Sequence, residues 1–467
     1  MSQPIPWAPV WIESPTLDDI RRALPDYRRM TLQVLDAILQ RSERDPDDPF
    51  IDTKFSTITG EDFVAGEQGE TLFKSRETVY AWIQGRALEA LIGHAHWLQS
   101  CTEISADIRH DRVERIGRLA AQLAAALESV RERNNGRLFF TFLGDGTPIR
   151  FGKDGKPRPC EIPLESNFSE LFVAKGLLAA GDFFRRLDWL ESGQSLLLRI
   201  CRDIESGHFR GDQIPYPPVE KPILTSLQCQ APWMIALGAH ALAYRVSADP
   251  QWLERGLRYL DTIMDNHLNL GQFAGLQLLD LVENLDTSGR PLDENGMILS
   301  SIGHVMEVVG LGTQVLLLLQ KSKELAPARR ERAIRRYQEL LPRVLLHHFD
   351  LGFNPEAGGI CLTVDLLTRK PVNTHLPWWI LPETLRAAAE VLVFSPDQPE
   401  YQQILQLLQH CSNAFLHRFV NPKVSLFAYQ TRNNQGDPID WIPATPDADP
   451  GYHTGLSVID FLRCLTP

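Results

Sequence analysis

Apolar positions recur at the helical period along most of the chain, and short polar or Gly- and Pro-containing segments separate the periodic stretches. This pattern predicts twelve helices, at 26–41, 77–100, 112–133, 168–187, 191–206, 227–247, 249–267, 301–321, 329–347, 377–393, 398–418 and 451–465. Strand-like runs such as "RLFFTFL" and "GGICLTVD" fall between helices and are bounded by Gly, Asp and Asn, which indicates hairpins in long loops. The chain is therefore predicted to be mainly helical.

The predicted helices alternate between two kinds. In each successive pair the first helix is charged with one apolar stripe, and the second is apolar nearly all round; "WLERGLRYLDTIMDNH" before "GHVMEVVGLGTQVLLLL" is an example. A one-striped helix faces solvent, whereas a fully apolar helix is surrounded by others. Six such pairs predict two concentric rings of helices, an all-α (α/α)6 barrel, although periodicity alone leaves an open helical solenoid as the alternative. We expect one domain over residues 1–467, with residues 1–25 as a peripheral N-terminal extension.

Composition narrows the classes of function. The chain has 467 residues, with 47 Lys and Arg against 59 Asp and Glu, and no basic block, which argues against a nucleic-acid partner. Its seven cysteines are scattered without a CxxC pair, as in a reduced cytoplasmic protein. The N-terminus shows no basic leader followed by an apolar run, and the stretch from Val308 to Leu319 is shorter than the ~20 residues that span a bilayer. We therefore expect a cytoplasmic protein without a membrane partner.

Polar groups gather on the predicted inner helices, mostly near their amino-terminal ends. Any one of them is explained by a helix cap or by a local pair, as for two groups three residues apart. Burying several around one axis is costly unless they are paired or used. Because inner helices that run the same way point to one mouth, the sequence predicts a polar pocket there, formed by Arg86, Glu170, His304, Glu307, Glu383 and His453.

A series of local motifs, from about residue 75 to 465, follows the order found in a known family. The chain resembles the N-acylglucosamine 2-epimerase family, which includes cellobiose 2-epimerases and aldose–ketose isomerases. The motifs that carry the resemblance are "WIQGR" (82–86), "NFSELF", "LVENLD" (281–286), "GHVMEV" (303–308), "GFNPEAGGI" (352–360), "WW" followed by Glu383, and "GYHTGL".

The resemblance implies an (α/α)6 barrel that transfers a proton at C2 of an open-chain sugar of the mannose or glucose type, with or without an N-acyl group. It implies His304 and His453 as the acid–base pair and Arg86 as the group that holds the substrate oxygen. Glu307 and Glu383 would orient the imidazoles, Glu307 acting on His304. No cofactor, metal, nucleic acid or membrane is implied, and a homodimer is left open. The implied substrate-binding residues are Glu170, Glu283, Asn284, Trp378 and Trp379.

The residue types suit this chemistry. A C–H bond beside a sugar aldehyde is weakly acidic, so its removal needs a base that is unprotonated near neutral pH and a cation beside the developing enediolate. Two histidines on opposite faces would remove the proton and return it, which inverts C2. Return of the proton to C1 instead gives aldose–ketose isomerisation.

Some positions depart from the family pattern. Glu89 stands where many relatives carry an aromatic residue, and Gly455 stands where they often carry Arg. The acidic loop from Asp52 to Lys74 is long enough to cap the mouth.

Two other classes of function stay open from the sequence. A glycoside hydrolase or lyase on the same barrel would use a pair of carboxylates, drawn from Glu170, Glu283, Glu307 and Glu383. A non-catalytic interaction protein is the other. The presence of both histidines together with Arg86 favours catalysis.

Overall fold

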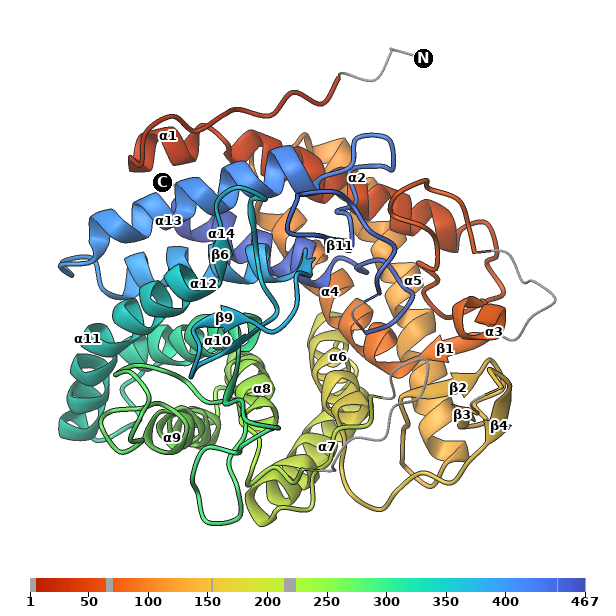
Figure 1. The fold of residues 1–467 in the computed structure, drawn as a ribbon. Helices are drawn as coiled ribbons and strands as arrows, with labels where there is room; N and C mark the ends of the chain where they lie inside the picture. Colours follow the sequence, from red (N-terminus) through yellow and green to blue (C-terminus); the bar gives the residue numbers. More distant parts are fainter. Residues whose placement is uncertain (1–5, 64–69, 153, 214–223, 443, 467) are drawn as a thin grey trace.

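The computed structural model describes residues 6–63, 70–152, 154–213, 224–442 and 444–466, and Figure 1 shows its helices in two concentric rings. Within these residues all twelve predicted helices are present. The inner ring consists of α4 (Ala81–Ser100), α6 (Phe168–Phe184), α8 (Ala231–Ser247), α10 (Ile302–Lys321), α12 (Ile380–Phe394) and the π-helix η2 (Tyr452–Ser457) continued by α14 (Val458–Leu465). The outer ring consists of α2 (Leu24–Ser42), α5 (Ala106–Arg133), α7 (Leu187–Ser206), α9 (Pro250–Asn266), α11 (Pro327–Gly352) and α13 (Tyr401–Ala414), continued by η1 (Phe415–Phe419). Two short helices, α1 (Leu17–Arg21) and α3 (Glu70–Lys74), lie outside the rings.

The inner ring is closed. Each inner helix packs against the next in chain order, and η2 packs against α4, which joins the last inner element to the first. The fold is therefore an (α/α)6 barrel, as predicted, and the open solenoid is excluded.

Burial follows the apolar pattern that predicted the rings. On α9 the buried residues form one stripe, which includes Trp252, Leu257 and Leu260, whereas α10 is buried at most of its positions. Among the described residues α10 is long and apolar enough to cross a bilayer, but 83% of that stretch is buried between other helices, as in a core helix. Close packing also demands small residues: a Cβ on Gly85 of α4 would lie 2.6 Å from the backbone of Phe172 on α6.

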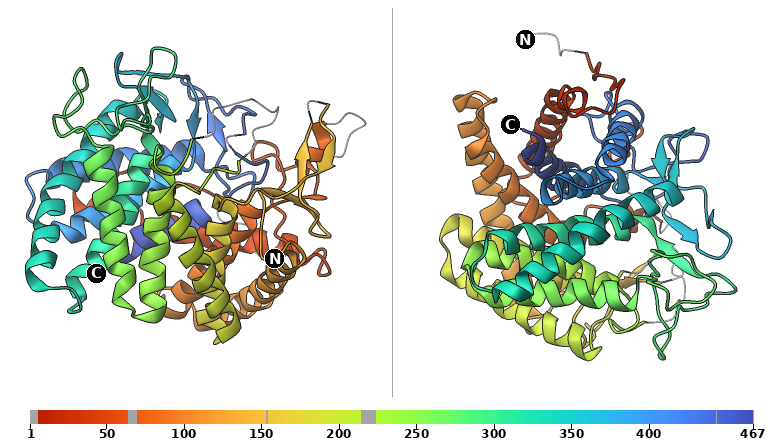
Figure 2. Two further views of the ribbon diagram at one scale, coloured as in Figure 1. Left: turned by 90° about the horizontal axis from the view of Figure 1, so that it is seen from below. Right: turned by 90° about the vertical axis from the view of Figure 1, so that its left-hand side faces the viewer.

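Short antiparallel strands lie in the loops at one end of the barrel, the upper end in the left-hand view of Figure 2. Three of them, β1, β5 and β10, lead directly into inner helices or their first turn, so this end holds the amino termini of the inner ring. The pairs are β1 (Thr78–Tyr80) with β2 (Thr141–Leu143), β3 (Ile149–Phe151) with β4 (Pro157–Pro159), β6 (Phe353–Asn354) with β7 (Gly359–Ile360) and β10 (Leu376–Pro377) with β11 (Thr431–Arg432). A three-stranded sheet has the order β5 (Leu299–Ser301), β8 (Thr363–Asp365), β9 (Lys370–Pro371).

The segment before α2 lies on the outside of the barrel, along α13 and η1 (Figure 1). The Trp7 indole donates to the carbonyl of Leu416, and the amide of Ile12 donates to the Asn413 side chain. Residues 6–23 therefore contact the outer helices, and residues 1–5 lie outside the described residues. The single domain with a peripheral extension stays a prediction.

Two helices begin differently from the prediction, because their first residues form a strand or a π-helix. The helix predicted from residue 377 begins at Ile380, because Leu376 and Pro377 pair with β11. The last predicted helix begins with the wider turns of η2, after Gly451 at a φ of 84°.

Candidate active site

His453 lies at the mouth of the barrel and is held by Glu383 of α12. Its Nδ1 is 2.7 Å from Oε1 of Glu383, and the Ser457 hydroxyl donates to the same oxygen at 2.7 Å. The other oxygen, Oε2, accepts from the Arg386 guanidinium. Burial opposes ionisation of Glu383, but Arg386 and His453 outweigh it and lower its pKa to about 2. Glu383 is therefore a carboxylate, so Nδ1 of His453 donates and Nε2 is left free for chemistry.

His304, in the first turn of α10, is held in the same way by a different carboxylate. Its Nδ1 lies 2.8 Å from Oε1 of Glu283, whose Oε2 accepts from Gln230 at 3.0 Å. Burial disfavours the charged imidazole, but the charge and hydrogen bond of Glu283, aided by Glu307, raise the pKa of His304 to about 9. His304 is therefore an imidazolium at neutral pH.

The sequence-based expectation assigned the orientation of His304 to Glu307. The structure differs, because Glu283 makes the hydrogen bond and Glu307 contributes only through its charge. Glu283 lies in the loop before β5, and the pattern of polar groups on inner helices does not include loop residues. Its signal in the sequence was the "LVENLD" motif, for which the resemblance implied substrate binding and not the orientation of His304.

Glu307 lies one turn into α10, among the other charged groups. Its ligand atoms, those of Glu383 and those of His453 lie within 4.8 Å of one another, which among the described residues is the one group that matches metal-ligand spacing. Burial, and then the charge of Glu383, raise the pKa of Glu307. The Arg386 guanidinium against Glu383 would repel a metal cation at this point, so the donor set suits imidazole orientation better than metal binding.

Trp379 lies close to both histidines. Its ring centroid is 6.2 Å from that of His304 and 5.6 Å from that of His453. A Cβ on Gly303 would lie 2.1 Å from the indole, so glycine before His304 leaves room for this ring. Trp378 meets His453 edge to face, with centroids 6.3 Å apart. The two predicted tryptophans therefore both flank His453.

Arg86 is framed by aromatic rings. Its guanidinium carbon lies 4.2 Å from the ring centroid of Phe172, 5.3 Å from that of Tyr452 and 5.4 Å from that of Trp82. Its Nε is buried without a hydrogen-bond partner. The Arg86 guanidinium is therefore held by aromatic rings, and its N–H groups can donate to an oxygen of a ligand.

The structure also explains the two departures from the family pattern. Glu89 pairs with the buried Lys175 at 2.9 Å, and Lys175 in turn donates to the Tyr452 hydroxyl at 2.7 Å. Gly455 has no room for a side chain, because a Cβ there would lie 2.3 Å from Nε2 of His94.

Two predicted site residues are engaged elsewhere. The Glu170 carboxylate, buried in the first turn of α6, pairs with Arg137 at 2.6 Å and Arg199 at 2.7 Å. The Asn284 side chain donates to Glu294 at 3.0 Å. Neither makes a contact with the histidines, so we leave both out of the proposed reacting group.

A small hollow of about 30 Å³ lies between Arg86 and His453. It is comparable with the volume of one water molecule in the liquid, about 30 Å³, and is too small for a sugar. Its wall includes Thr445, Asp447 and Asp449, loop residues that the sequence pattern did not single out. A sugar that contacts both Arg86 and His453 needs more room than this hollow provides.

The predicted capping loop braces this wall. Lys54 pairs with Asp447 at 3.3 Å, and Thr53 exchanges hydrogen bonds with the backbone of Ala448. The rest of the loop includes residues 64–69, which lie outside the described residues.

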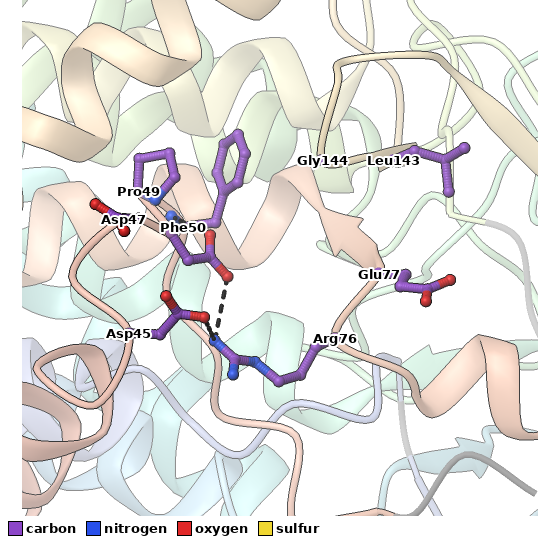
Figure 3. Close-up of a pocket in the computed structure, with 9 residues that line it drawn as sticks. Asp45, Asp47, Pro49, Phe50, Arg76, Glu77, Leu143 and Gly144 are labelled. Atoms are coloured by element: carbon purple, nitrogen blue, oxygen red, sulfur yellow. Dashed lines mark hydrogen bonds and ion pairs between the residues drawn. The ribbon is translucent and has the colours of Figure 1, made fainter.

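A larger hollow of about 570 Å³ lies elsewhere, at the end of α2 and beside β1 and β2 (Figure 3). Its lining includes Asp45, Asp47, Asp48 and Glu77, and Arg76 pairs with Asp45 and Asp48. Neither His304 nor His453 lines this hollow, so the larger of the two hollows is not the candidate active site.

Replacement of Glu283 by Gln is expected to change how stability depends on pH. A histidine whose pKa rises from 6.5 to about 9 on folding stabilises the protein fully below about 6.5, and this contribution is lost as pH rises through 9. In Glu283→Gln this loss should shrink, since the partner carboxylate is gone. Chemical denaturation at pH 6.5 and pH 9.5 measures it, with the exposed Glu356→Gln as control. Equal pH dependence in the wild type and Glu283→Gln would contradict the pairing.

Comparison with known proteins identifies the chain as a carbohydrate epimerase or isomerase. A family model described as N-acylglucosamine 2-epimerase matches residues 187–445, more than half of the chain. The chain belongs to this family, as its motifs indicated.

Solved structures agree on the fold. A sugar epimerase from a ruminal bacterium is 12% identical, with a TM-score of 0.62 over 96% of this chain and 98% of that one. Cellobiose 2-epimerase from Bacillus thermoamylovorans B4167 is 12% identical, with a TM-score of 0.58 over 83% and 88%. A D-mannose isomerase is 14% identical, with a TM-score of 0.58 over 92% and 97%. A search of curated proteins found no match.

Proposed function

We propose that the protein is a sugar 2-epimerase or aldose–ketose isomerase that moves a proton at C2 of an open-chain aldose between His304 and His453. The observation that carries the proposal is a pair of imidazoles that both lie against Trp379, each with Nδ1 on a carboxylate. This arrangement leaves two Nε2 atoms for proton transfer at one mouth. The sugar is of the mannose or glucose type, with or without an N-acyl group.

Their hydrogen bonds suggest different roles for the two histidines. Glu283 keeps His304 as an imidazolium at neutral pH, so we assign His304 as the acid, and His453, whose Nδ1 donates to Glu383, as the base. Nε2 of His453 takes the C2 proton, and the C2–H electron pair forms the C1–C2 double bond of the enediolate. His304 then gives its proton to C2 on the opposite face, which inverts the carbon. If His453 returns its proton to C1 instead, and the hydroxyl proton moves from O2 to O1, the product is the ketose.

Arg86 would stabilise the enediolate. The negative charge develops on the sugar oxygen at C1, and a guanidinium held by Phe172 and Tyr452 needs no rearrangement to meet it. Trp379 offers a ring face to the C–H groups of the sugar, a contact that carbohydrate sites commonly use.

A glycoside hydrolase would need two carboxylates free to act as acid and base or nucleophile. Three of the four candidates are committed to other groups: Glu170 to two arginines, Glu283 to His304, and Glu383 to His453 and Arg386. Glu307 remains, and one carboxylate does not make the pair. This distribution favours proton transfer over hydrolysis.

Deuterium exchange at C2 tests the proposal. Incubation with mannose, glucose and their N-acyl derivatives in D2O, followed by NMR, should show deuterium at C2 of at least one sugar and formation of its epimer or ketose. Hydrolysis leaves the C2–H bond intact and consumes water at C1. Release of reducing ends from oligosaccharides without exchange in any of these sugars would favour the hydrolase instead.

Three further expectations from the sequence stay predictions: a cytoplasmic location, a homodimer, and the absence of a metal or other cofactor. The same exchange assay after treatment with a chelator tests the last of them, because proton transfer between two imidazoles should continue at the same rate.

A further inference from the structure

Charged residues form a stripe along the inner face of α12. Glu383, Arg386 and Glu390 follow one another at intervals of three and four residues, which places them on one side of the helix. Their exposed fractions are 0%, 5% and 3%. Such a stripe in an otherwise apolar helix needs a reason, because each buried charge costs free energy unless it is paired.

Arg386 and His453 share the Glu383 carboxylate. The Arg386 guanidinium donates to Oε2, whereas His453 and Ser457 use Oε1. The charged and titratable groups that face Glu383 are therefore Arg386 on its own helix, His453 on η2 and Glu307 on α10. Among these Arg386 is the permanent cation.

The lower end of the stripe is hydrogen-bonded to Gln314. Gln314 of α10 donates to Glu390 and to Asp460 of α14, both at 2.9 Å. Burial and the charge of Asp460 raise the pKa of Glu390 to about 8, so Glu390 is protonated at neutral pH. In the structure Arg386 makes its hydrogen bond to Glu383.

We propose that Arg386 is a positioning residue for the reaction proposed above: it keeps Glu383 ionised and so fixes the proton of His453 on Nδ1. An ionised Glu383 can only accept, which makes Nδ1 the donor and leaves the Nε2 lone pair to act as base. A protonated Glu383 would donate to Nδ1 instead. The ring would then carry its proton on Nε2 and could not remove a proton from the sugar.

The test compares three variants. Arg386→Met removes the cation and keeps an unbranched side chain of similar length. Arg386→Gln also removes the charge but can still donate to Glu383, which keeps the buried carboxylate hydrogen-bonded if the methionine variant does not fold. Glu390→Gln is the matched control one turn below, because it replaces a neutral acid by an amide of the same shape.

Two readouts separate positioning from a merely structural effect. Nitrogen-15 NMR of labelled histidine reports which ring nitrogen of neutral His453 carries the proton, with the resonance identified by its loss in His453→Asn. The C2 exchange assay gives kcat, KM and the pH profile. The NMR reading needs no sugar, so it decides the role of Arg386 even if no sugar is turned over and the proposed function fails.

The wild type and Glu390→Gln are expected to hold the proton on Nδ1. Arg386→Met and Arg386→Gln should move it to Nε2, lower kcat about 10- to 100-fold with little change in KM, and shift the acid limb of the pH profile upward, since the pKa of Glu383 rises without its cation. An unchanged tautomer and pH profile in a folded Arg386 variant would overturn the proposal, as would a tautomer change in Glu390→Gln.

Discussion

His304→Asn and His453→Asn are each expected to abolish conversion of the sugar, with a loss of at least about 100-fold. Each change removes the Nε2 that transfers a proton. The asparagine amide can still donate to the carboxylate that holds Nδ1, Glu283 or Glu383, so neither variant leaves that group unpaired. Formation of epimer or ketose, measured by NMR, gives the rate, and circular dichroism reports the fold.

The control for both variants is His110→Asn, since His110 is exposed on α5, away from the mouth. It should convert sugar at the wild-type rate. If His304→Asn and His453→Asn also retained conversion, the two histidines would not be the acid and the base.

Arg86→Lys should lose most of the rate although the positive charge is kept. The guanidinium is planar, lies over the Phe172 and Tyr452 rings, and can donate to two adjacent sugar oxygens at once. A lysine ammonium is a point charge without this fork. Removing one such donor from a developing oxyanion typically costs about 100- to 1000-fold in kcat, which is the loss we expect here.

The matched control is Arg185→Lys, because the Arg185 side chain is 86% exposed at the end of α6. Its rate should equal that of the wild type. A rate for Arg86→Lys close to that of Arg185→Lys would mean that Arg86 does not stabilise the enediolate.

The fold could be predicted because the apolar side chains that the two rings bury recur with the helical period along the chain. One-striped helices such as α9 and apolar helices such as α10 differ in sequence because the first contacts solvent on one side and the second does not. Closure of the ring was not predictable in this way. It depends on the contact of η2 with α4, which joins segments more than 350 residues apart.

The candidate site was predictable where it lies on helices. Arg86, His304, Glu383 and His453 were singled out as polar groups on apolar helices, and the structure brings the last three around Trp379 and Glu307. Glu283 and Asp447 approach from loops, whose path follows from no periodicity. Glu170 is the opposite case. It lies near the amino-terminal end of an inner helix, as predicted, but its carboxylate pairs with Arg137 and Arg199, which the helical pattern did not indicate.

Arg386 did have a signal in the sequence. Its spacing from Glu383 and Glu390 marks a charged stripe on a helix predicted to be buried. The sequence analysis considered histidines and carboxylates as candidates, and so it did not single out Arg386, an arginine that we propose acts on the carboxylate of Glu383.

The contact between η2 and α4 sets the order in which the molecule can be completed during synthesis. Until the ribosome has released residues 452–465, the apolar faces of α4 and α12 lack the neighbour that η2 and α14 provide. The nascent barrel is therefore an open ring with an unpaired seam, the kind of exposed surface that chaperones bind and that aggregates when it persists. Because His453 belongs to the same closing segment, the candidate active site and the seam are completed together, so a chain stalled before this segment has neither.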